Sequence, residues 1–73
     1  MNAERREVIE LLSELSTMYP EMRIGQLLTW FASAARGPKP ESIYDAEDDE
    51  LIAVMRAHVA QKHVEQNATA ASN

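Results

Sequence analysis

Apolar residues recur along this chain at intervals of three and four, in three separate stretches. The first stretch carries Val8, Leu11, Leu12, Leu15 and Met18. The second carries Ile24, Leu27, Leu28, Phe31 and Ala35, and the third carries Leu51, Ile52, Met55 and Val59. Because an α-helix makes a turn every 3.6 residues, each series lies along one face of a helix. The pattern therefore predicts three amphipathic helices.

Proline and glycine mark the limits of the first two helices. Tyr19-Pro20 ends the first helix, because proline disfavours a helical conformation for the residue before it. Pro20 itself suits the first position of the second helix, where the missing N–H is not needed. Gly37-Pro38 ends the second helix, since glycine adopts the left-handed stop conformation and proline prevents the helix from resuming.

A stiff linker at 37–42 leads to the third helix. Ile43 and Tyr44 follow it as an apolar pair, which we expect to dock against the core. Asp45 is the expected N-cap of the third helix, and Asp48 three residues later completes a carboxylate form of the capping box.

These elements predict an all-α fold, a small three-helix bundle. The helices are expected at about 3–17, 20–36 and 46–65, within a single helical domain that spans 1–65. Residues 66–73 show no hydrophobic periodicity, so they are predicted to form a disordered C-terminal tail. Helices of this length are marginal alone in water, and packing between them must hold the fold together.

The size and composition of the chain favour association with a partner. A domain of 73 residues buries only about 60% of the surface that its unfolded chain exposes, so the single core is marginal. The sequence has no cysteine, which excludes disulfides and thiolate zinc sites. We therefore expect another protein, or a second copy of the chain in a homodimer, to supply further stabilisation.

The charge of the chain narrows the class of partner. Seven Lys and Arg stand against twelve Asp and Glu, a formal net charge of −5. Because an acidic protein repels nucleic acid and anionic membranes at long range, neither is the expected partner. No stretch is apolar enough for a signal peptide or a membrane span, so we expect a cytoplasmic protein.

A run of acids at 45–50 lacks the pattern of a calcium loop. Such a loop needs glycine at its sixth position and a bidentate Glu at its twelfth. Counted from Asp45, those positions hold Glu50 and Arg56. Acids at the start of a helix instead complement the positive end of the helix dipole. The run therefore predicts no metal site.

The two histidines are also unsuited to a metal or to catalysis. His58 and His63 are five residues apart, which places them about 140° apart around a helix, on different faces. Both are expected to be solvated or partly packed. A catalytic site needs a nucleophile and an orienting acid in a pocket, which a three-helix chain of this size rarely encloses. We predict a non-enzymatic protein with no catalytic residues and no cofactor.

The most informative single residue is Trp30, at the edge of the second apolar stripe. It either covers the edge of the core or serves as an exposed anchor for a partner, since Trp and Arg are enriched at interface hot spots. Gly25 lies in the same helix, where glycine costs about 1 kcal/mol relative to alanine. A neighbour is therefore expected to approach closely there, either the third helix or a partner.

A DNA-binding function is the alternative. Residues 21–40 hold Arg23, Arg36 and Lys39 against Glu21 alone, a positive stretch in an acidic chain. The first two helices would then imitate a helix-turn-helix whose second helix enters the major groove. Glu21 at the end that would meet the bases, and the overall negative charge, argue against this interpretation.

Two segments carry a resemblance to known sequences. The segment 19–28 contains aromatic-Pro-acid-x-Arg-x-Gly-Gln-Leu, and the segment 43–51 contains an aromatic residue followed by Glu-Asp-acid-Glu-Leu. This two-part pattern resembles that of small uncharacterised bacterial proteins. The resemblance covers about nineteen of the 73 residues. It implies a bacterial or phage origin and no catalytic activity.

The same segments suggest two roles for Arg23. It is one of few cations of the second helix, and Glu47, Asp48 and Glu50 open the third, so folding is expected to pair Arg23 with one of these acids. Alternatively, Arg23 meets a partner. The predicted partner-binding residues are then Arg23, Gln26 and Trp30, on the face of the second helix near Trp30.

Overall fold

A computed structural model describes the backbone of residues 1–71 and the side chains of residues 1–64. Its described residues form four helices and no strand: α1 (Ala3–Met18), α2 (Ile24–Arg36), α3 (Ser42–Asp45) and α4 (Asp48–Ala71). The prediction of an all-α fold is confirmed. The three predicted helices correspond to α1, α2 and α4, and the one-turn helix α3 is additional. Over the described residues, no helix offers an apolar stretch long enough to cross a bilayer.

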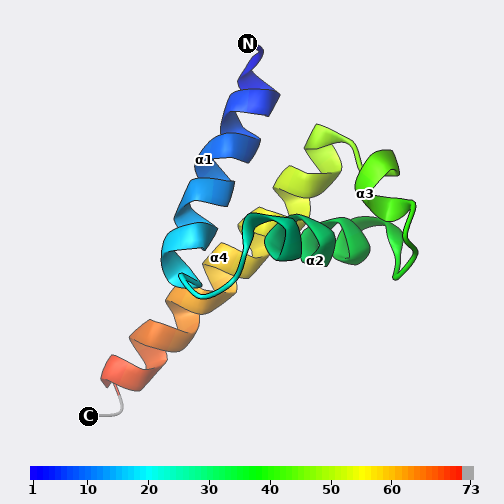
Figure 1. Cartoon of the computed structure of the whole chain (residues 1–73). Coiled ribbons are helices and arrows are strands. Elements are labelled where there is room, and N and C mark those ends of the chain that lie inside the picture. Colours follow the sequence, from blue (N-terminus) through cyan, green and yellow to red (C-terminus); the bar gives the residue numbers. More distant parts are fainter. Residues whose placement is uncertain (72–73) are drawn as a thin grey trace.

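Helices α1 and α4 run side by side in the same direction, and α2 lies across α4 (Figure 1). Ion pairs hold α1 and α4 in register along their length. Arg5 pairs with Asp48 and Glu7 pairs with Arg56, and farther along Nε2 of His63 lies 3.7 Å from Oε1 of Glu14. Helix α3 packs against α2, beyond its C-terminal end.

The core lies where the three long helices meet. It consists of Val8 and Leu15 from α1, Leu27, Phe31 and Ala32 from α2, and Ile52, Met55 and Val59 from α4. These buried residues come from the three predicted stripes, with Ala32 in addition. The prediction for Ile24 is wrong, because 48% of this residue is exposed. A helix that crosses its neighbour contacts it only near the crossing point, so the first residue of α2 lies outside the core.

The segment between α1 and α2 is a turn, where the sequence predicts a helix that starts at Pro20. The N–H of Met22 donates to the carbonyl of Tyr19 at 3.1 Å, with Pro20 at the second position of the turn. The fixed φ of proline suits that position as well as it suits the start of a helix. Helix α2 begins only at Ile24, with Arg23 as its N-cap.

The segment that follows α2 also differs from the prediction. Gly37 ends α2 with a positive φ of 97°, as expected, but its ψ of 164° is extended and differs from the left-handed stop conformation. The hydroxyl of Ser42 is buried and donates to the carbonyl of Gly37 at 2.6 Å, which ties α3 to the end of α2. Because this turn points Ser42 inward, its two successors face outward: 41% of Ile43 and 87% of Tyr44 are exposed. The prediction that this pair docks against the core is wrong.

Both ends of α4 differ from the predicted helix. Asp45 belongs to α3, and the N-terminus of α4 is capped two residues later, where Glu50 Oε1 accepts from the N–H of Glu47 at 2.9 Å. At the other end, the backbone of α4 continues through residues 66–71, which belong to the tail that the sequence predicts beyond the helix. Alanine has the highest helix propensity, and three of these six residues are alanine. Residues 72 and 73 of that predicted tail lie outside the described residues.

The core predicts a sharp contrast between two residues of α1. Leu15 is completely buried, so Leu15→Ala should lower the free energy of unfolding by about 2–5 kcal/mol. Ile9 is exposed on the same helix, and Ile9→Ala should cost less than about 1 kcal/mol. Urea denaturation followed by circular dichroism measures both changes. Equal losses for the two variants would contradict the position of the core.

Candidate protein-binding surface

Trp30 is part of an aromatic cluster at the junction of α2, α4 and the turn that follows α1. Its ring stacks on Phe31, with 5.0 Å between centroids and an interplanar angle of 28°. Tyr19 and His58 contact it edge-on, at 5.7 and 5.0 Å between centroids. Even so, 40% of Trp30 is exposed. The ring therefore covers the edge of the core and is also partly exposed, while its role as an anchor for a partner stays a prediction.

A hydrogen bond fixes the neighbours of Trp30. The hydroxyl of Tyr19 lies 2.7 Å from Nε2 of His58, which joins the turn after α1 to the middle of α4. His58 also packs against Phe31, at 5.5 Å between ring centroids. His58 is therefore partly packed, one of the two expected environments. Trp30 is held in position before any partner arrives, which lowers the entropic cost of binding.

The three predicted partner-binding residues lie together in space. Arg23, Gln26 and Trp30 line one shallow, open hollow, with a volume of about 720 Å³. Gly25 and Thr29 complete its lining, and we call these five residues the Trp30 hollow. Thr29 is not among the three partner-binding residues that the sequence predicts. Thr29 and Trp30 follow Gln26 by three and four residues, so all three lie on one face of a helix. This spacing could have identified Thr29 from the sequence.

Gln26 also has a structural role at this surface. Its Oε1 accepts a hydrogen bond from the backbone N–H of Arg23 at 2.8 Å, one half of a capping box at the start of α2. This bond satisfies a donor that the helix itself leaves unpaired. The amide nitrogen of Gln26 remains as a donor for an acceptor in a partner.

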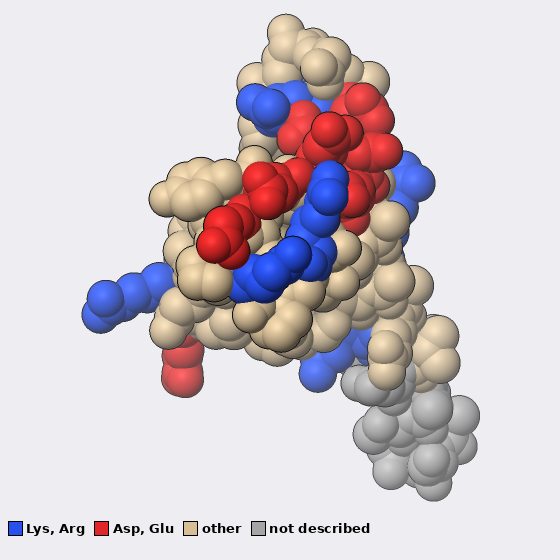
Figure 2. Space-filling model, turned by 90° about the vertical axis from the view of Figure 1, so that its right-hand side faces the viewer, with Lys and Arg blue, Asp and Glu red and all other residues tan. Residues whose placement is uncertain are grey.

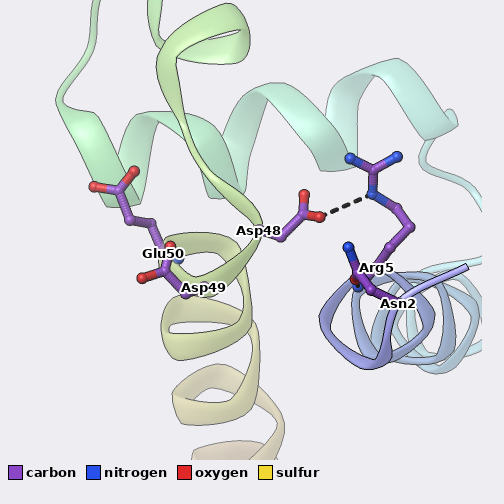
Figure 3. A network of polar contacts seen from close by, with 5 residues as sticks. All are labelled: Asn2, Arg5, Asp48, Asp49 and Glu50. Carbon is purple, nitrogen blue, oxygen red and sulfur yellow. Dashed lines mark hydrogen bonds and ion pairs between the residues drawn. The ribbon is translucent and has the colours of Figure 1, made fainter.

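The predicted ion pair between Arg23 and the acidic run is wrong. Arg5 forms an ion pair with Asp48 instead, with 2.9 Å between Nε and Oδ2 (Figure 3). Arg36 forms an ion pair with Glu50, with 3.0 Å between Nη2 and Oε1. Arg23 lies at the opposite end of α2 from the acids. Within the described residues Arg23 forms no ion pair, so its charge is available to a partner.

Carboxylates gather on the face that carries α3 and the start of α4, with Lys and Arg among them (Figure 2). The pKa of Glu50 lies below its ordinary value, chiefly because its carboxylate accepts from the N–H of Glu47. Desolvation opposes this effect and raises the pKa of Glu50, whereas the hydrogen bond and the charge of Arg36 lower it further. The pair with Glu50 also neutralises Arg36, one of the three cations on which the DNA-binding alternative depends.

Among the described side chains, no group of three or more acids or histidines is arranged to hold a metal ion. No protein-family model matches this chain, and no curated protein or solved structure matches it either. The resemblance to small bacterial proteins therefore stays a prediction. A function has to be inferred from the residues of the surface themselves.

Gly25 gives a prediction about stability. A Cβ at this position would meet no other atom within 4 Å, so the expected close neighbour is not α4 or any other described element. Gly25→Ala should therefore stabilise the chain by about 0.4–1 kcal/mol, because alanine loses less conformational freedom on folding. Thermal denaturation measures the change. Unchanged or lower stability would show that the folded chain itself needs glycine here.

Glu50 gives a prediction about pH. A carboxylate whose pKa is lowered by folding contributes stability above its unfolded pKa of about 4.3, and this contribution is lost as the pH falls through the lower folded pKa. Glu50→Gln keeps an oxygen for the N–H of Glu47 but removes the charge. The wild type should therefore lose more stability than Glu50→Gln between pH 5 and pH 3, measured by urea denaturation. Parallel curves would contradict the role of the charge.

Proposed function

We propose that this chain is a cytoplasmic, non-enzymatic protein-binding module, and that it binds another protein or a second copy of itself through the Trp30 hollow. The observation that carries this proposal is the state of Trp30. The ring is anchored by Phe31, Tyr19 and His58, yet a large fraction of it stays exposed at the edge of an open hollow. Exposed aromatic side chains in fixed positions are the usual anchors of interface hot spots.

The surroundings of Trp30 support the same function. Ile24 leaves about half of its surface uncovered near this end of α2, so the exposed apolar surface is not limited to one ring. Arg23 adds a charge that no acid of the described residues neutralises. A central aromatic group with a charged and polar rim is the composition expected of a protein interface.

DNA binding remains the alternative, and the same surface weighs against it. Two of the three cations that suggested it lie at the far end of the positive stretch, and Arg36 there is already paired with Glu50. One available arginine beside Glu21 provides few phosphate contacts, while affinity for DNA depends on many.

The test of the proposal is capture of partners with variants of this surface. Tagged wild type, Trp30→Ala and Thr29→Arg are incubated with nuclease-treated lysate of the source cell. Thr29 is exposed, so Thr29→Arg should fill the hollow without disturbing the core. Bound proteins should be lost with both variants, and a purified partner should bind Trp30→Ala with an affinity lower by about 2 kcal/mol or more.

Ile9→Ala is the matched control, because it removes an exposed apolar side chain from another face. It should capture the same proteins as the wild type. Circular dichroism of each variant checks that the helices are intact. Capture and self-association that are both unchanged in Trp30→Ala and Thr29→Arg would overturn the proposed function. Binding that nuclease abolishes would favour DNA.

A further inference from the structure

A second exposed aromatic residue lies at the other end of α2. Tyr44, on α3, is the most exposed of the large apolar and aromatic residues in the described part of the chain, at 87%. Ile43 beside it is also exposed, and so are the acids Glu41 and Asp45. We call these four residues the Tyr44 corner. The corner is an apolar projection flanked by carboxylates.

The Tyr44 corner is held in a defined position. Ser42, at the start of α3, is buried and bonded to the carbonyl of Gly37, so the helix that carries Tyr44 is fixed to the end of α2. Neither Glu41 nor Asp45 forms an ion pair within the described residues, whereas their neighbours Asp48 and Glu50 do. The corner therefore keeps both an aromatic ring and unneutralised negative charge for an outside contact.

The Trp30 hollow has the complementary properties. It is a concave surface next to an aromatic ring, and it contains no acid. Arg23 in its lining supplies a positive charge without a partner in the described residues. Tyr44 is of a size to enter such a hollow, and either acid of the corner would then find Arg23 nearby. Aromatic groups that fill pockets and charges that pair across an interface are the two determinants of such contacts.

The hollow cannot take the corner of its own chain. The hollow is formed by residues at the N-terminal half of α2, while α3 follows the C-terminal end of the same helix (Figure 1). A helix of 13 residues is about 20 Å long at 1.5 Å per residue. The two complementary surfaces are thus kept apart by a rigid element, and only another molecule brings them together.

We propose that the occupant of the Trp30 hollow is the Tyr44 corner of a second copy of this chain. Tyr44 of the second copy packs against Trp30, and Asp45 or Glu41 of the second copy pairs with Arg23. This inference rests on the proposed function and names the partner of that surface. The contact is head-to-tail, so each pair keeps one free hollow and one free corner. Such contacts build open chains, or rings where the rotation closes.

The association is expected to be weak and to depend on concentration. One aromatic side chain in an open hollow buries much less than the roughly 800 Å² per partner of a standard stable interface. Each copy also carries a net charge of −5, which opposes association at long range. Oligomers should therefore increase steadily as the concentration of the full chain is raised.

Two exposed substitutions test the proposal by complementation. Thr29→Arg blocks the Trp30 hollow and keeps the Tyr44 corner intact. Tyr44→Ala removes the aromatic ring of the corner and keeps the hollow intact. In sedimentation velocity, each variant alone should associate at least about tenfold more weakly than the wild type. An equimolar mixture should form two-chain species and nothing larger, because one intact hollow meets one intact corner. Ile9→Ala is the control and should associate like the wild type.

A charge exchange tests the polar part of the same contact. Arg23→Glu should weaken association, and Asp45→Arg should weaken it as well. A mixture of the two variants should associate more strongly than either alone, because the charges are opposite in both contacts between unlike variants: Asp45 meets Arg23 in one, and the two exchanged residues meet in the other. Arg6→Glu makes the same change of charge on α1, away from both surfaces, and should leave the association of the chain as it is.

Three results would overturn the proposal: a wild type that is monomeric at every concentration, Tyr44→Ala that associates like the wild type, or variant mixtures that do not recover association. The second would show that Tyr44 does not occupy the hollow of another copy. The proposed function is judged separately, by the lysate capture. Suppose that one of these three results is found, but the wild type captures a protein that Trp30→Ala and Thr29→Arg do not. The hollow then binds that protein, the proposed function stands, and only the proposal of self-association is rejected.

Discussion

Three side chains that meet at one place hold this protein together. Leu15, Leu27 and Met55 are completely buried in the same cluster, and each comes from a different long helix. Because α2 crosses α4 at this place, it covers the core only with its middle turns. The two ends of α2 extend past the core, and the Trp30 hollow and the Tyr44 corner lie toward those ends. The geometry of one crossing thus sets both the fold and what is left uncovered.

Charge is distributed by the same arrangement. The parallel course of α1 and α4 brings Arg5 to Asp48, and the C-terminal end of α2 brings Arg36 to Glu50. These two ion pairs within the chain neutralise part of the acidic run. Arg23 at one end of α2 and Asp45 near the other are left without ion pairs among the described residues. An acidic chain thereby keeps a local positive site and a local negative site on separate surfaces.

Trp30 combines packing against the core with partial exposure. Its contacts with Phe31, Tyr19 and His58 join α2 to α4 and to the preceding turn. The same contacts keep the ring from moving, which makes its exposed part a better anchor. A free ring would lose rotamer entropy on binding, whereas this one has already lost it on folding.

The sequence by itself determined the three long helices, most of their buried stripes, the stop at Gly37 and three of the five residues that line the hollow, because helical periodicity and backbone restrictions are local properties. Tertiary structure decided the rest. Pro20 suits both a turn and a helix start, and Ile24 suits both a core and a surface. Only the crossing of α2 over α4 selects between these alternatives. The same crossing determines which arginine reaches the acidic run, because residues distant in sequence become neighbours only through packing.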